Sequence, residues 1–137
     1  MPKDWYGRLR EWWDSWTQHP WYFKKRHCLL QGTANSGKTT AARFITNNRK
    51  AFIPSSNFNF CLQGLNDTYD YILWDDFQFN HTNRRNLLLL MQGDEISIDV
   101  KCGAAFTICW RKPIIFTTNF EIDDDAFLAR IEIINTD

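Results

Sequence analysis

Apolar runs and helical repeats alternate along this chain. Five short runs contain few polar residues, which is typical of strands that a parallel sheet buries on both faces. The residues after the first run, and residues 83–91, instead place apolar positions at helical spacing. Since strands alternating with helices predict a parallel arrangement, we expect an α/β fold with a mostly parallel five-stranded sheet flanked by helices. The expected strands are residues 28–30, 51–53, 69–74, 114–118 and 131–134.

Three further stretches complete the pattern. Residues 4–18 carry tryptophans at helical spacing and predict a short N-terminal helix, whose aromatic stripe is more often used for packing than for stacking bases. Residues 96–100 and 106–110 alternate between apolar and polar positions, so they predict a β-hairpin insertion. The aromatic-rich residues 55–65 fit a short helix better than a strand.

The most informative stretch is GTANSGKT, which matches the phosphate-loop pattern G-x-x-x-x-G-K-[ST] between an expected strand and an expected helix. In such a loop, glycines let successive backbone N–H groups surround a phosphate chain, and the helix N-terminus adds partial positive charge. We expect Lys38 to reach the β- and γ-phosphates of ATP and the Thr39 hydroxyl to bind Mg²⁺. The expected nucleotide contacts are Gly32, Thr33, Ala34, Asn35, Ser36, Gly37, Lys38, Thr39 and Thr40.

Polar residues follow two of the other expected strands. Asp75 and Asp76 come directly after residues 69–74, at the carboxyl end where parallel sheets place ligand-binding groups. We expect Asp75 to bind Mg²⁺, directly or through water, and Asp76 to orient or deprotonate the water that attacks the γ-phosphate. Asn119 follows the strand 114–118 and could hydrogen-bond the γ-phosphate or that water, or could cap the next helix.

Arg130 has two possible roles. It could be a buried partner for one of the aspartates at positions 123–125. It could instead project from the subunit surface as an arginine finger that acts on a neighbour's nucleotide.

Composition limits the partners. Lys+Arg and Asp+Glu both number 16, so the net charge is zero and any contact with nucleic acid must be local. The four cysteines form no C-x-x-C pair and share no metal-ligand spacing with the histidines; Cys28 and Cys109 lie in apolar runs and are expected to be buried thiols in a reducing compartment. No apolar run approaches the ~18 residues of a membrane span, and no signal peptide opens the chain. We therefore expect an intracellular protein without membrane contact.

Taken in order, the segments GTANSGKT, YILWDDF, ISIDVKCGAAFTI, PIIFTTN and FLARI resemble the superfamily 3 helicases of small DNA viruses. The resemblance covers residues 25–134 and includes features of papillomavirus, polyomavirus and parvovirus proteins and of circovirus-type Rep proteins. It implies a superfamily 3 ATPase domain over residues 25–137, which leaves residues 1–24 as the Trp-rich helical segment that the spacing predicts. The implied cofactors are ATP and Mg²⁺.

The resemblance also implies roles for the candidate residues. Lys38, Asp75, Asp76, Asn119 and Arg130 would be catalytic, with Arg130 acting across a subunit boundary. Members of this superfamily are hexameric rings that hydrolyse ATP and move 3′→5′ on single-stranded DNA. The hairpin around Lys101 would line the channel of that ring and bind DNA. For a virus of eukaryotes this implies the host nucleus, and otherwise the cytoplasm.

The sequence departs from the family in two places. Cys102 stands where papillomavirus and polyomavirus proteins carry a histidine at the hairpin tip, and no origin-binding or nickase motif is found in this chain. Three alternatives stay open. They are a nucleoside or nucleotide kinase, which would need an arginine-rich lid; an RNA-virus ATPase of the same superfamily; and a nucleotide-binding oligomerisation fragment without unwinding activity.

Overall fold

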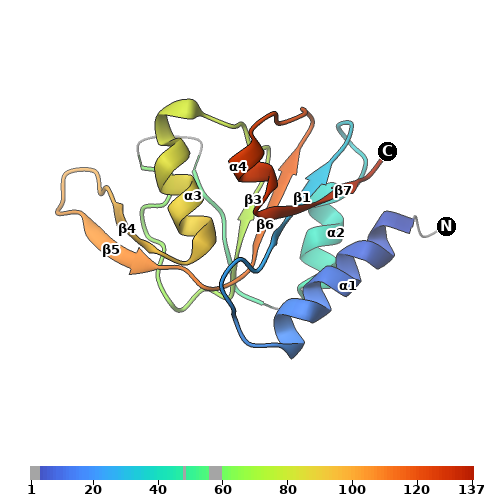
Figure 1. Cartoon of the computed structure of the whole chain (residues 1–137), viewed down its shortest axis with the longest axis horizontal. Helices are drawn as coiled ribbons and strands as arrows, with labels where there is room; N and C mark the ends of the chain where they lie inside the picture. Colours follow the sequence, from blue (N-terminus) through green and yellow to red (C-terminus); the bar gives the residue numbers. More distant parts are fainter. Residues whose placement is uncertain (1–3, 48, 56–59) are drawn as a thin grey trace.

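The computed structural model describes residues 4–47, 49–55 and 60–137 and places a five-stranded sheet at its centre (Figure 1). The strand order is β2-β3-β6-β1-β7, and every neighbouring pair is parallel. The predicted α/β fold with a parallel five-stranded sheet is therefore confirmed. The strands are β1 (His27–Gln31), β2 (Ala51–Phe52), β3 (Tyr71–Trp74), β6 (Ile114–Thr118) and β7 (Ile131–Asn135).

Helices cover both faces of the sheet because consecutive apolar residues of each buried strand point to opposite sides. Leu30 of β1 faces α1 (Asp4–Gln18) and α2 (Lys38–Ile45). Leu29 faces α3 (Arg84–Gln92) and α4 (Asp125–Leu128). Figure 1 shows α1 and α2 on one side of the sheet and α3 on the other.

The N-terminal helix contributes a hydrophobic stripe to the core. Each turn buries one or two side chains, and these side chains join the same cluster as the strands and α2. The aromatic stripe thus packs on its own chain, as the helical spacing favours. The buried residues of α1 are Trp5, Leu9, Trp12, Trp13 and Trp16.

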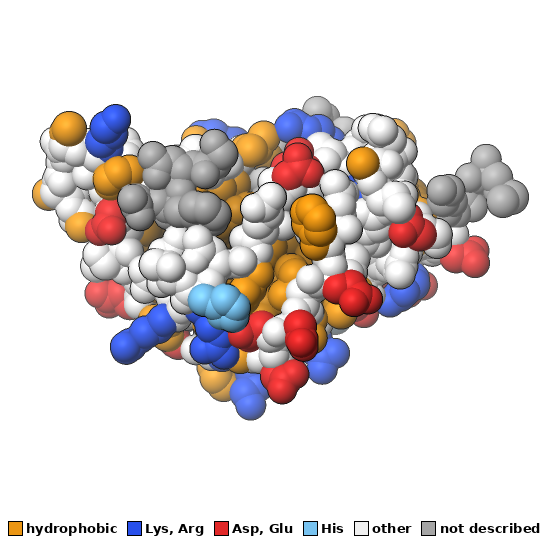
Figure 2. Space-filling model, turned by 90° about the horizontal axis from the view of Figure 1, so that it is seen from above, with side chains coloured by type: hydrophobic (Ala, Val, Ile, Leu, Met, Phe, Trp, Pro, Cys, Tyr) orange, Lys and Arg blue, Asp and Glu red, His pale blue; other side chains and the backbone are white. Residues whose placement is uncertain are grey.

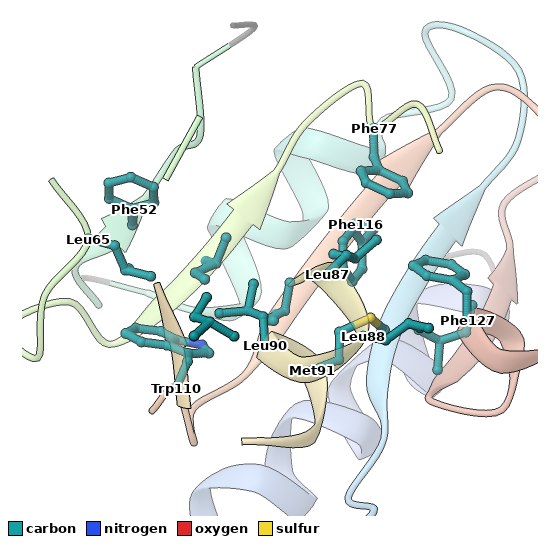
Figure 3. Packing of buried hydrophobic residues seen from close by; sticks show 14 of the residues in the cluster. Phe52, Leu65, Phe77, Leu87, Leu88, Leu90, Met91, Trp110, Phe116 and Phe127 are labelled. Carbon is teal, nitrogen blue, oxygen red and sulfur yellow. The ribbon is translucent and has the colours of Figure 1, made fainter. Parts of the chain in front are cut away.

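Aromatic rings fill the core on the other face, close to the carboxyl ends of the strands. Phe77 lies 4.7 Å from Phe116 and 5.5 Å from Phe127, measured between ring centroids. Figure 3 shows these three rings with the buried leucines of α3 alongside them. This cluster supports the backbone that leads from β3 into the next loop, because Phe77 comes directly after the Asp75–Asp76 pair.

The predicted hairpin is present. β4 (Glu95–Ile98) and β5 (Phe106–Cys109) pair antiparallel, with Ile96 opposite Ile108. Figure 1 shows the hairpin extending away from the main sheet beyond α3. Its tip carries Lys101, whose side chain is exposed.

Two local expectations are wrong. Cys109 is exposed, because it lies opposite Glu95 on the outward face of the two-stranded hairpin, whereas Cys28 is buried as expected. Residues 60–64 form turns and no helix; the start of the expected helix, residues 56–59, lies outside the described residues. The segment contacts the hairpin tip instead, since the Lys101 N–H donates to the Gln63 side-chain oxygen at 3.0 Å.

His27 connects three elements at the amino end of β1. Its Nδ1 accepts a hydrogen bond from the Ile114 N–H at 3.0 Å, so Nε2 carries the proton and donates to the Met91 carbonyl at 2.8 Å. The ring is fully buried, and this burial lowers the pKa of His27 to about 4 although the bond to Met91 acts in the opposite direction. The neutral imidazole therefore belongs to the folded state.

Candidate nucleotide site

The phosphate loop joins the end of β1 to the start of α2. Gly37 precedes the helix with φ 87°, a left-handed conformation that favours glycine. Lys38 is buried, and its ammonium group donates to the carbonyls of Gly32 at 3.0 Å and Thr33 at 2.6 Å and to the Ser36 hydroxyl at 3.2 Å. The lysine therefore lies inside the concave loop, where it can exchange these oxygens for phosphate oxygens.

The first turn of α2 meets the end of β3 through Thr39 and Asp75. The Thr39 hydroxyl donates to Asp75 Oδ1 at 2.6 Å, and the Thr117 hydroxyl of β6 donates to the same oxygen at 2.7 Å. Burial raises the pKa of Asp75, but the hydrogen bonds from Thr39 and Thr117, together with the Asp76 N–H and the charge of Arg43, leave it below its ordinary value. The carboxylate is thus held ionised.

Asp76 adopts an unusual backbone conformation. Its φ is 51°, in the left-handed region that aspartate tolerates better than most residues. The turn is fixed by two hydrogen bonds to the neighbouring strand: the Asp76 N–H donates to Thr117 Oγ1 at 3.0 Å and the Phe77 N–H to the Thr117 carbonyl at 2.7 Å. The Asp76 carboxylate is exposed and lines a cavity of about 520 Å³ between β3, α3 and the hairpin.

Asn119 lies at the same end of the sheet. It follows β6, the strand between β1 and β3. The Gly32 N–H donates to the Thr118 carbonyl at 3.1 Å, which places Asn119 next to the phosphate loop. Figure 2 looks onto this end of the molecule and shows acidic side chains around a hollow in which hydrophobic side chains are visible. The structure therefore gathers the phosphate loop, both aspartates and Asn119 along one edge.

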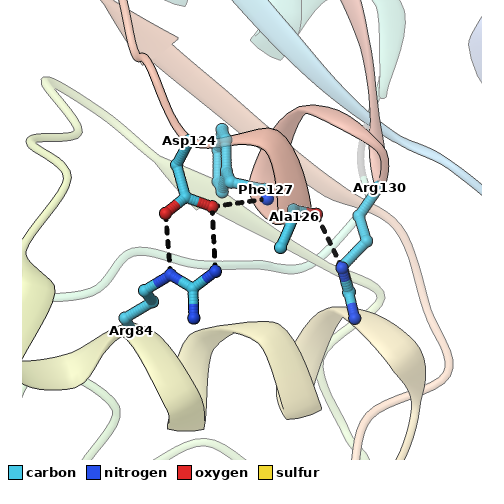
Figure 4. Close-up of polar contacts among 5 residues, drawn as sticks. All are labelled: Arg84, Asp124, Ala126, Phe127 and Arg130. Carbon is cyan, nitrogen blue, oxygen red and sulfur yellow. Dashed lines mark hydrogen bonds and ion pairs between the residues drawn. The ribbon is translucent and has the colours of Figure 1, made fainter.

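Arg130 lies at the opposite end of the sheet. Its backbone carbonyl accepts from the His27 N–H at 3.0 Å, beside the first residue of β1. Its guanidinium donates to the Ala126 carbonyl at 2.6 Å (Figure 4). It also donates to the side-chain oxygen of Gln92. Of its two possible roles, pairing with an aspartate at positions 123–125 is not found in the part of the chain that the structure describes, where Asp124 forms an ion pair with Arg84 at 2.7 Å.

Three residues at this site were not singled out by the sequence. Thr117 is one, since it binds both Asp75 and the backbone of Asp76. The other two follow β7: Thr136 Oγ1 lies 2.8 Å from Ser36 Oγ, and Asp137 Oδ1 accepts from the Thr33 N–H at 2.9 Å. They support the phosphate loop only because β7 is the neighbour of β1, and a strand order of this kind leaves no local sequence signal.

Comparison with known proteins agrees with this geometry. A sequence profile of the family described as "Parvovirus non-structural protein NS1" matches residues 12–123. The chain belongs to this NS1 family. The match spans the phosphate loop, the aspartate pair, the hairpin and Asn119. A comparison with curated protein sequences found no significant match.

Solved structures of the helicase of JCV, a polyomavirus, share the fold of this NS1-family chain. JCV helicase bound to a thiazolopyridine acetamide compound gives a TM-score of 0.62 at 18% identity over 96% of this chain. A second structure of JCV helicase gives a TM-score of 0.58 at 18% identity over 95% of this chain, and an inhibitor-bound form gives 0.60 at 19% identity over 95%. The match covers 41%, 40% and 39% of those chains, so this chain spans about two fifths of their length.

None of the helices in the described residues is both long and apolar enough to cross a bilayer. No group of three or more His, Cys, Asp or Glu side chains in that part of the chain is arranged to hold a metal ion. A nucleotide-associated Mg²⁺ needs fewer, because it keeps several waters and takes one or two protein ligands plus phosphate oxygens. The adjoining oxygens of Thr39 and Asp75 fit that requirement.

Proposed function

We propose that this chain is the ATPase domain of an ATP-dependent DNA helicase that acts in the replication of a small DNA virus. The observation that carries the proposal is the contact between Thr39 and Asp75, which brings the phosphate loop and the acidic strand end to one point. NS1 family membership and the JCV helicase fold support it. A eukaryotic host would then place the protein in the nucleus.

Each residue at the edge has a defined part in hydrolysis. The Lys38 ammonium would leave the loop oxygens that it now binds and neutralise the β- and γ-phosphates. Thr39 and Asp75 would hold Mg²⁺, which when bound spreads the charge of the β- and γ-phosphates. The exposed Asp76 carboxylate would orient the attacking water, and Asn119 would hydrogen-bond that water or the γ-phosphate.

The nucleic-acid part of the proposal rests on the hairpin. Lys101 is exposed at a tip that extends beyond the sheet, and a ring of such lysines, one from each subunit of a hexamer, would grip the phosphates of single-stranded DNA. A chain without net charge requires a local contact of this kind. ATP turnover would move the ring 3′→5′ along the strand.

The test separates nucleotide binding from hydrolysis. Lys38→Ala should abolish ATP–Mg²⁺ binding, because the phosphate charge loses its partner. Asp76→Asn should bind ATP normally but lower kcat by about 10²-fold or more, the usual effect of removing a general base. Asp67→Asn changes an exposed carboxylate before β3, at the other end of the sheet, and should leave both quantities unchanged. Wild-type turnover in Lys38→Ala or Asp76→Asn would refute the site.

A further inference from the structure

The segment between α1 and β1 forms a tight turn with an unfavourable backbone. The Lys25 N–H donates to the Tyr22 carbonyl at 3.1 Å, so Phe23 and Lys24 are the two central residues. Lys24 has φ 69°, the left-handed conformation that this position of a turn normally reserves for glycine or asparagine. A lysine there costs stability, and strained residues of this kind cluster at functional sites.

Lys25 fixes the turn to the rest of the molecule. Its side chain is only 5% exposed, and its ammonium donates to the Ser15 carbonyl at 3.0 Å and the His19 carbonyl at 3.1 Å, at the end of α1. The same ammonium lies 4.6 Å from the Trp16 ring centroid and 5.4 Å from that of Tyr22. This cation is therefore structural, and it holds the turn in one position.

The fixed turn presents aromatic rings and cations to solvent. Tyr22 and Phe23 are each 58% exposed, and Lys24 and Arg26 on either side of Lys25 are exposed as well. A hollow of about 340 Å³ lies beside the turn, and its lining contains more cations than carboxylates. The charged residues that line it are Arg8, Lys24, Lys25, Arg26, Glu11 and Glu132.

The turn is connected to the base of the hairpin. Trp21 stacks on Arg111, with 4.5 Å between the guanidinium carbon and the ring, and Arg111 follows β5. Arg111 Nε also donates to the Gly93 carbonyl at 3.3 Å, just before β4. The residue just before the turn therefore contacts the base of the hairpin whose tip carries Lys101.

We propose that residues 22–26, which we call the aromatic turn, are a second contact for single-stranded DNA. Exposed rings beside cations are what unpaired nucleic acid requires, because every base offers a face for stacking and every nucleotide a phosphate. Tyr22 and Phe23 stack bases, and Lys24 and Arg26 contact phosphates. The inference rests on the proposed DNA-dependent function and adds a stacking contact, which the lysine at the hairpin tip does not supply.

The test measures the binding of a fluorescent oligo-dT to the full chain by anisotropy, with one pair of variants and a matched control. Tyr22→Ala/Phe23→Ala should weaken binding about tenfold or more, because each stacked base contributes substantially. Lys24→Gly should weaken binding and lower the salt slope by about one, while the melting temperature stays level or rises, because glycine adopts the positive φ freely. Phe44→Ala removes a ring that is 69% exposed on α2 and should change nothing.

The outcomes separate this inference from the proposed function. If the wild-type chain does not bind oligo-dT, the DNA-dependent function fails and the inference fails with it. If Lys101→Ala abolishes binding but the aromatic-turn variants retain wild-type affinity and salt slope, the inference alone is overturned. If those variants change the mass of the assembly and leave DNA affinity intact, the rings pack against a second copy of the chain, which also overturns it.

Discussion

Gly32, the first glycine of the phosphate loop, is required because a larger residue has no space there. A Cβ at this position would lie 2.1 Å from Thr136 Oγ1 and 3.1 Å from Asp137 Oδ1. Thr136 is fully buried, and its N–H donates to the Gln31 carbonyl at 2.8 Å, so it cannot move aside at low cost. The start of the loop thus contacts Lys38 on one side and Thr136 and Asp137, which follow β7, on the other.

Gly32→Ala should therefore displace the loop and lower ATP turnover about 100-fold, since shifts of about 1 Å near an active site have effects of that size. The double variant Gly32→Ala/Thr136→Ala should recover part of the loss, because it removes the hydroxyl that causes the clash. Steady-state ATPase assays of both single variants and the double variant measure the coupling. Additive losses in the double variant would show that this contact does not constrain the glycine.

At this scale, the sequence points to candidate residues when they stand together in one motif. Lys38 and Thr39 were identified as candidates, with roles towards ATP that stay predictions, because the loop spacing carries its own chemistry. Thr117 and Thr136 were not, because their roles arise from hydrogen bonds to residues 42 and 100 positions away in the sequence. Which threonine meets which loop depends on strand order, and periodicity carries no information about strand order.

Among the elements, β1 depends on a buried histidine that must stay neutral. The lowered pKa of His27 means that the unfolded chain takes up a proton first as the pH falls. The stabilisation is complete above the unfolded pKa of about 6.5 and is lost as the pH falls from there towards the folded value of about 4. The full loss in the free energy of unfolding is about 3 kcal/mol, which follows from the difference between these two pKa values.

Urea unfolding at several pH values between 7.5 and 4.5 should show this loss in the wild-type chain. His27→Gln keeps a polar side chain but cannot be protonated in this range, so its stability should fall less steeply with pH. Carboxylates that titrate in the same interval affect both proteins, and the difference between the two curves isolates the histidine. Parallel curves would mean that His27 does not control acid stability.

Elements were predictable in proportion to the regularity of their pattern. The hairpin and the helix α1 follow clear periods of two and 3.6 residues, and both were expected in the correct place. The apolar residues of segment 60–64 follow no regular period, and its turns are joined to the hairpin tip by the hydrogen bond from the Lys101 N–H to the Gln63 side chain. The burial predicted for Cys109 is wrong because a two-stranded hairpin buries only one of its faces. The apolar neighbours of Cys109 are instead typical of a strand that is buried on both faces.

At the scale of the whole molecule, the position of Arg130 bears on whether several copies of the chain assemble. The four steps from His27 to Gln31 along β1 separate it from the phosphate loop of its own chain by about 13 Å. We propose that it acts on the nucleotide of a neighbouring subunit. Arg130→Ala and Lys38→Ala should each be inactive alone, yet a mixture should regain part of the ATPase activity, because some interfaces then pair an intact loop with an intact arginine.

The control for this experiment is an assay in which mixed assemblies are shown to form, for example by native mass spectrometry of differently tagged subunits. With mixing established, absence of any recovery would assign Arg130 a structural role. The structure provides for that alternative, since Arg130 joins α4 to α3 through Ala126 and Gln92.

The position of β1 in the sheet has a consequence for folding. Both of its neighbours, β6 and β7, come from the last part of the chain, more than 80 residues later. Contacts so distant in sequence form late and slow the folding of a domain. A chain emerging from the ribosome therefore exposes its phosphate-loop motif long before the loop can take shape. Under the proposed function, ATP would therefore stabilise only molecules in which β7 has docked, and it would not assist molecules in which β7 is still unpaired.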